Sequence, residues 1–219
     1  MARLLFQKSG RAIWISHLDL MRLFQRAFKR AGLQLKHTQG YNPRPSVSIA
    51  LPLSVGIESC CELLDFELEG EIPSNQEIAS RLNTALTEGI EVLKVYDGGK
   101  KLRDLALLSC QVLLEYDEGT DETVAQRIRE LYKRPALQVS KKSKNGPVEQ
   151  DIIPMIRQLE VNLKDGNIIC ITAQICCQNP SMNPLQLAQA IERYLPECKP
   201  DHYTCRRLEI CDGTGNVFR

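Results

Sequence analysis

The segment at residues 36–45 combines side chains that bind nucleic acids, in the order KHTQGYNPRP. Imidazole and aromatic rings stack on bases, amides hydrogen-bond to base edges, and cations contact phosphates. Prolines at positions 43 and 45 restrict the backbone and hold the loop extended. The residues that we expect to contact bases or another ligand are His37, Tyr41, Asn42 and Arg44. The alternative is a rigid structural loop with Tyr41 packed beneath a helix.

A second set of candidates lies on one face of a predicted helix that begins after Ser16. Residues 1–50 contain nine Lys and Arg but one acid, Asp19, whereas the whole chain has a formal net charge of +1. Such asymmetry indicates a polyanionic partner, and Lys and Arg contacts to phosphate dominate nucleic-acid affinity. The predicted phosphate-binding residues are Arg22, Arg26, Lys29 and Arg30. The alternative is neutralisation by an acidic surface, since residues 58–91 contain nine acids and one cation, Arg81.

His17 is the single residue whose chemistry would be catalytic. At the first turn of a helix, the positive end of the helix dipole favours a neutral imidazole. A neutral histidine near cations could act as general acid or base on an RNA 2′-hydroxyl, which would make the chain a metal-independent ribonuclease. The other reading is that His17 fixes the junction between strand and helix. A lone histidine without a visible partner favours this structural role.

The remaining candidates are weaker. Lys141 and Lys142 lie in a polar segment and could extend a basic track. The chain has nine cysteines and no C-x-x-C motif, and the grouping of Cys198, His202 and Cys205 lacks a fourth ligand for structural zinc. We therefore predict reduced cysteines in the core, no metal and no cofactor.

The elements that position these residues form a pattern of strand, helix, strand, strand, helix, strand. Apolar runs predict strands at residues 2–8 and 11–15, turning at Ser9 and Gly10. Ser16 and Asp19 form a capping box, an apolar stripe with helical spacing follows, and Gly32 ends the helix. Strands at 46–53 and 60–69, a helix at 75–88 and a strand at 90–96 complete the ferredoxin-like order.

The second half repeats this order. We predict a strand at 108–116, a helix at 121–134, and a strand that starts at 137–140 and resumes at 152–156. A hairpin at 158–163 and 167–176, a helix after Asn183 and Pro184, and a strand at 206–211 follow. The predicted fold class is α+β, with two ferredoxin-like (βαββαβ) halves and antiparallel sheets. The domains are residues 1–98 and 105–219, joined by a Gly-Gly-Lys-Lys linker.

Residues 3–70 resemble the radical SAM-linked protein family. The resemblance rests on F-x-K-x-G at 6–10, SHLDLMR at 16–22, RA at 26–27, RAG at 30–32, QGYNP at 39–43, ALPL at 50–53 and VG at 55–56. It implies a partner, a radical SAM enzyme that carries a cobalamin-binding domain, but no reaction for this chain. The paired ferredoxin-like halves are also similar in architecture to CRISPR repeat-processing endonucleases.

These observations predict a cytoplasmic accessory RNA-binding protein that works with a radical SAM enzyme, presenting a tRNA or rRNA substrate to it. No apolar run approaches the ~20 residues that span a bilayer, and the first residues lack the pattern of a signal peptide. We expect no catalysis by the chain itself. Two alternatives stay open: the ribonuclease with His17 as acid or base, and a protein-interaction module that docks the radical SAM partner without RNA.

Overall fold

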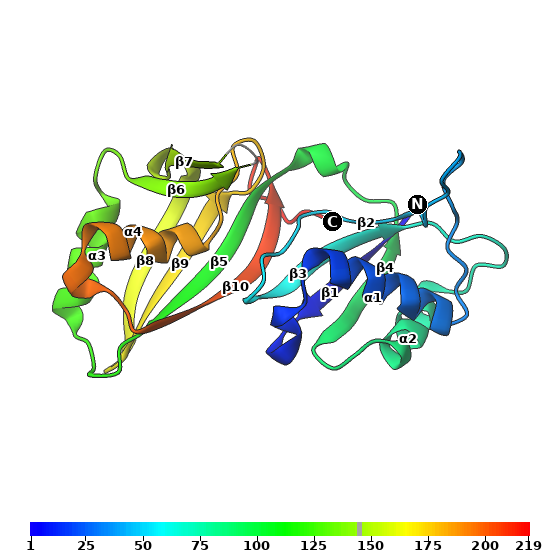
Figure 1. Ribbon diagram of the computed structural model, residues 1–219, viewed down its shortest axis with the longest axis horizontal. Coiled ribbons are helices and arrows are strands. Elements are labelled where there is room, and N and C mark those ends of the chain that lie inside the picture. Colours follow the sequence, from blue (N-terminus) through cyan, green and yellow to red (C-terminus); the bar gives the residue numbers. More distant parts are fainter. Residues whose placement is uncertain (144–145) are drawn as a thin grey trace. The chain divides into compact units, whose positions relative to one another are not determined.

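In each half of the chain, helices cover one face of the strands (Figure 1). The computed structural model describes residues 1–143 and 146–219. These divide into one unit of residues 1–102 with Arg219 and a second unit of residues 103–218. Within the described residues, no helix is long and apolar enough to cross a membrane.

The first unit has the predicted ferredoxin-like topology. Its elements are β1 (Ala2–Lys8), α1 (His17–Arg30), β2 (Val47–Ile49), β3 (Ile57–Phe66), α2 (Asn75–Ala85) and β4 (Ile90–Asp97). The strand order is β4-β1-β3, with β2 paired to β3, and every pair is antiparallel. The two helices are the crossovers that this order requires.

The second unit has the same topology with one addition. Its elements are β5 (Leu105–Glu115), α3 (Glu122–Tyr132), β8 (Ile156–Asp165), β9 (Ile168–Cys176), α4 (Leu185–Tyr194) and β10 (His202–Asp212). The order β10-β5-β9-β8 is antiparallel throughout. Two ferredoxin-like units of an α+β protein confirm the predicted fold class.

The addition is a separate hairpin of β6 (Gln138–Ser143) and β7 (Gly146–Asp151), which pair only with each other within the described residues. The prediction of one interrupted strand over 137–140 and 152–156 is therefore wrong. Residues 138–143 pair back onto 146–151, and Ile153–Met155 forms a 3₁₀ helix, η3, before β8. Three further 3₁₀ helices are η1 (Gly10–Trp14), η2 (Leu102–Asp104) and η4 (Pro196–Cys198).

The predicted strand at 11–15 is also wrong, because η1 takes its place. Gly10 has φ +55°, which turns the chain away from β1. The carbonyl of Ile13 accepts from the N–H of Gly56 at 2.9 Å, and the carbonyls of Ile13 and Ile15 both accept from a lysine side chain. The buried ammonium of Lys8 donates to the carbonyls of Ile13 at 3.2 Å and Ile15 at 2.7 Å. This arrangement fixes the entry into α1.

Helix α1 is bounded and oriented by local sequence signals. The backbone N–H of Asp19 donates to the Ser16 hydroxyl at 3.2 Å, as expected for an N-cap. Gly32 has φ +68°, and the N–H of Leu33 donates to the Phe28 carbonyl at 2.9 Å, so the helix ends where the sequence predicts.

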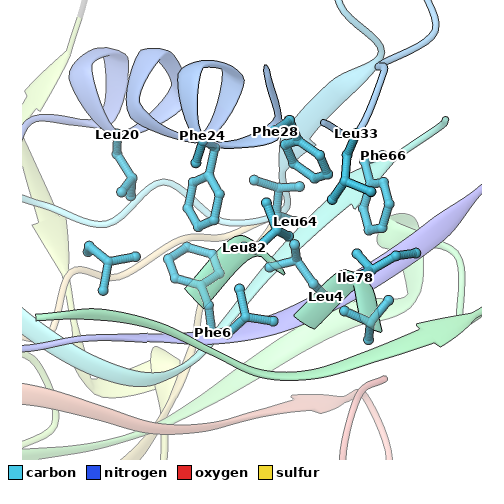
Figure 2. Close-up of a cluster of buried hydrophobic side chains, with 14 of the residues drawn as sticks. Leu4, Phe6, Leu20, Phe24, Phe28, Leu33, Leu64, Phe66, Ile78 and Leu82 are labelled. Atoms are coloured by element: carbon cyan, nitrogen blue, oxygen red, sulfur yellow. The ribbon is translucent and has the colours of Figure 1, made fainter. Parts of the chain in front are cut away.

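The apolar stripe of α1 packs on the sheet of the first unit (Figure 2). Phe24 lies edge-on to Phe6 of β1, with ring centroids 4.8 Å apart, and Phe28 lies 5.0 Å from Phe66 of β3. Ile78 and Leu82 of α2 belong to the same core. Burying each aromatic ring contributes roughly 1.5–3 kcal/mol. This packing determines which face of α1 is exposed.

Candidate nucleic-acid interface

The loop at 36–45 is closed at its base by backbone hydrogen bonds. The N–H of Thr38 donates to the Arg44 carbonyl at 2.8 Å, and the N–H of Arg44 donates to the Thr38 hydroxyl at 3.0 Å. The N–H of Ser46 donates to the Lys36 carbonyl at 2.7 Å. The loop therefore has a defined base next to β2, and its tip projects beyond these bonds.

The predicted ligand-contacting side chains of this loop are all exposed. Tyr41 is 100 % exposed, so its ring packs against no other part of the described chain. His37, Asn42 and Arg44 are exposed too. None of the four side chains makes a hydrogen bond or ion pair with any residue that the structure describes. The alternative in which Tyr41 packs beneath a helix is thus wrong.

The four cations of α1 differ in how they are used. Arg22 pairs with Asp19 at 3.0 Å, and Arg30 donates to the Ala85 carbonyl at 2.5 Å. Arg26 and Lys29 are exposed and have no hydrogen bond or ion pair in the described chain. Hydrogen bonding by the Ser16 hydroxyl, followed by the contact with Arg22, holds the pKa of Asp19 below its ordinary value.

The acidic segment at 58–91 does not neutralise this helix face. Within the described residues, none of its carboxylates pairs with a cation of α1. Glu67 pairs instead with Lys36 at 3.2 Å, and Glu77 pairs with Arg81 inside α2. Two helix cations therefore stay available for an anionic partner.

The loop and the helix face meet at a cavity. A hollow of about 520 Å³ is lined by Lys29 of α1 and by His37 and Pro45 of the loop. A second hollow of about 510 Å³ follows the other stripe of cations, Arg22, Arg26 and Arg30. The structure thus brings Lys29 of α1 together with the loop, whereas Arg22, Arg26 and Arg30 line a separate hollow. We define the α1–loop surface by its members, Arg22, Arg26, Lys29, Arg30, His37, Tyr41, Asn42 and Arg44.

His17 does not join this surface. It is the first residue of α1 and is half-buried, and its Nδ1 is buried without a hydrogen-bond partner among the described residues. Five residues along a helix correspond to a rotation of about 140° between His17 and Arg22. The imidazole therefore lies on a different side of α1 from the cations, next to the buried stripe.

Lys141 of the second unit has local partners. Its ammonium donates to the carbonyl and the hydroxyl of Ser181, at 2.7 and 2.9 Å. The backbone of Lys142 pairs with Pro147 in the hairpin, but its side chain lies outside the described part of the structure, as does Lys144. The geometry thus gives Lys141 a role in anchoring the β6–β7 hairpin.

Most of the cysteines are core residues, whereas Cys60 and Cys170 are half-buried. Cys110, Cys177, Cys198 and Cys205 are buried, and desolvation raises the pKa of Cys177 and of Cys205 to about 12. Within the described chain, no group of three or more His, Cys, Asp or Glu side chains is placed to hold a metal ion. His202 is exposed, whereas Cys198 and Cys205 are buried.

Sequence reasoning missed part of the cavity wall. Gln25, Leu33, Gln34 and Leu35 also line it. Gln25 could have been recognised from its spacing, because it lies one helical turn before Lys29 on the same face of α1. The other three were not recognisable, because their place depends on the pairing of Leu35 with Leu68 across the sheet edge.

Comparison with known proteins assigns a family. The model of DUF2344, described as uncharacterized proteins conserved in bacteria, matches residues 2–184. The chain belongs to this family. The loop at 36–45 and helix α1 both lie inside the DUF2344 match. No curated protein matches the chain. The link to radical SAM enzymes and the likeness to CRISPR endonucleases stay predictions.

Two solved structures are similar to this DUF2344 chain. A chain from the crystal structure of a Cbf5-Nop10-Gar1 complex matches with 9 % identity and a TM-score of 0.53, covering 95 % of this chain and 48 % of that one. This chain thus spans about half the length of that relative, and the likeness concerns the fold alone. An unknown protein from Galdieria sulphuraria matches with 12 % identity and a TM-score of 0.27, covering 94 % of this chain and 96 % of that one.

Proposed function

We propose that the chain is an accessory RNA-binding protein that holds RNA on the α1–loop surface. The observation that carries this proposal is that Lys29, a cation without an ion pair in the described chain, lines one hollow with His37 of a loop whose Tyr41 is fully exposed. Arg26, also exposed and without an ion pair there, lies on the same helix. Cationic grooves that track the backbone, combined with aromatic rings on which bases stack, are the arrangement by which proteins bind single-stranded nucleic acid.

The partner is proposed from the sequence resemblance. A radical SAM enzyme with a cobalamin-binding domain would carry out the chemistry, and this chain would present a tRNA or rRNA substrate to it in the cytoplasm. The separation of roles agrees with the place of His17, the candidate acid or base, which lies on a different side of α1 from the helix cations.

Neutralising the two unpaired cations tests RNA binding by this surface. The double variant Arg26→Gln and Lys29→Gln should bind RNA more weakly. Because the logarithm of the binding constant falls with the logarithm of salt by roughly 0.7 per contacted phosphate on single strands, the slope should decrease by about 1.4. Binding is measured by fluorescence anisotropy over a salt series.

The matched control changes the same residue types in the second unit. Arg157 and Lys164 lie on β8, are exposed and have no ion pair in the described chain. The variant Arg157→Gln with Lys164→Gln should keep the wild-type slope. Unchanged affinity and slope in the α1 variant, or an equal loss in both variants, would contradict the assignment of this surface.

One observation favours a contact with protein as a second function. Trp14 is 68 % exposed, and its ring lies beside Gly56, at which an added Cβ atom would be 3.5 Å from the ring. Val55, which precedes Gly56 in the chain, is 48 % exposed. Exposed aromatic and aliphatic groups of this kind occur in protein interfaces. If the chain docks its partner here, Trp14→Ala should abolish co-purification with the radical SAM enzyme after nuclease treatment, without affecting RNA binding.

A further inference from the structure

The cavity of about 520 Å³ between α1 and the base of the loop has the size of a small-molecule site. It lies where the second half of α1 faces residues 32–37. Tyr41 is not part of its wall. The cavity and the tip of the loop are therefore separate places on the α1–loop surface.

The apolar wall of the cavity is fixed by the fold. Leu33 and Leu35 are 3 % and 7 % exposed. The N–H of Leu33 donates to the Phe28 carbonyl at 2.9 Å, and Leu35 forms a bridge with Leu68. His37 forms a bridge with Pro45, which closes the wall on the loop side. Since each segment is held by backbone hydrogen bonds, the hollow exists before a ligand arrives.

The polar groups of the cavity suit a planar ligand with an attached anion. Lys29 has no ion pair in the described chain, and the imidazole of His37 has no hydrogen bond there. Gln34 donates to Glu69 at 2.6 Å, which fixes the orientation of its amide, and Gln25 lies half-buried one turn before Lys29. An aromatic ring, amides and one cation are the groups that recognise an unstacked base and its phosphate.

We propose that this cavity holds one unstacked nucleobase of the bound RNA. His37 stacks on the base, the amides of Gln25 and Gln34 hydrogen-bond to its edge, and Lys29 contacts its phosphate. This inference rests on the proposed RNA-binding function. An acidic peptide is the competing ligand, but the apolar floor of Leu33 and Leu35 favours a base, because a carboxylate would be desolvated there without a second cation.

The test uses the full chain and short single-stranded oligoribonucleotides. One set carries 2-aminopurine at each position in turn, and a matched set has an abasic site at the same positions. At one position, we expect the wild type to quench aminopurine fluorescence and to lose about tenfold in affinity when the base is removed. His37→Ala should bind the intact and abasic oligonucleotides equally and should not quench.

Two further variants separate the cavity from the rest of the surface. Gln25→Phe places a larger apolar side chain at the cavity and should weaken binding of the intact oligonucleotide but not of the abasic one. Gln158→Ala, at an exposed position of β8 in the second unit, is the control and should behave as wild type. Thermal unfolding shows whether each variant is folded.

The outcomes distinguish this inference from the proposed function. If removing a base never changes the affinity while the double variant Arg26→Gln and Lys29→Gln still binds RNA more weakly, the cavity proposal is wrong and the RNA-binding proposal stands. If no oligonucleotide binds, both are wrong. If no oligonucleotide binds but polyglutamate binds wild type and not His37→Ala, the cavity belongs to an acidic protein segment.

Discussion

Aromatic residues of the first unit fall into two environments that predict opposite roles. Phe24 and Phe28 of α1 are fully buried, whereas Tyr41 is 100 % exposed. A buried ring stabilises the fold through the apolar area that it removes from water. An exposed ring on a loop closed by its own hydrogen bonds contributes little to folding, which agrees with the proposed contact with RNA.

Replacing Tyr41 and Phe28 separates these roles. Tyr41→Ala should lower RNA affinity by about tenfold, the loss of one base–aromatic stack, and leave the free energy of unfolding unchanged. Phe28→Ala should lower the free energy of unfolding by about 3–5 kcal/mol. Urea denaturation and RNA binding are measured on both proteins. Wild-type RNA affinity in Tyr41→Ala would show that the exposed ring does not bind RNA. Destabilisation of Tyr41→Ala would show that the ring contributes to the fold.

His17 decides between a binding protein and a ribonuclease. Its Nδ1 is buried without a partner in the described chain, and it lies away from the helix cations. We therefore expect wild type and His17→Ala to leave tRNA equally intact, as seen on denaturing gels, and to bind it equally. Cleavage by wild type that disappears in a His17→Ala protein with normal binding would establish the enzyme instead.

At the scale of elements, α1 was predictable because its signals are local. The cap at Ser16, the buried stripe and Gly32 all act within a few residues, and the structure places each as expected. The conformation of residues 11–15 was not predictable, since the carbonyls of Ile13 and Ile15 accept hydrogen bonds from Lys8 of the preceding strand. The β6–β7 hairpin was missed for a similar reason, as the polar run at 141–147 gives no apolar alternation to reveal two strands.

The N-terminus of α1 should also give a pH-dependent stability. The pKa of Asp19 is lowered in the folded protein, first by the Ser16 hydroxyl and then by Arg22. A carboxyl whose pKa is lower when folded stabilises the protein above its unfolded pKa of about 4, and this contribution is lost as pH falls through the folded value. Asp19→Asn should therefore be less stable than wild type at pH 7, and this deficit should shrink as the pH falls towards 2.

Urea denaturation at both pH values measures this difference. The control is Asp117→Asn, because Asp117 is exposed and its side chain makes no contact in the described chain. This variant should match wild type at pH 7. A deficit of Asp19→Asn that persists unchanged at pH 2 would mean that the charge of Asp19 is not its source.

At the scale of the whole molecule, charge asymmetry indicated the half that carries the proposed site but not which of its cations are unpaired. The sequence placed nine cations within residues 1–50, yet only the structure separates Arg26 and Lys29, which are unpaired, from Arg22 and Arg30, which have partners. The cavity was not predictable, because its wall joins a helix, a loop and a bridge to Leu68 that is distant in sequence.

The most direct test of the central claim is RNA binding by the whole chain. Purified protein is titrated with total tRNA and with an unrelated RNA of equal length over a salt series. We predict tight, salt-steep binding that prefers one RNA class, because the proposed phosphate contacts would set the salt dependence and the proposed loop contacts would read bases. Equal binding of both RNAs, no tighter than micromolar at physiological salt, would contradict the account and leave protein docking as the function.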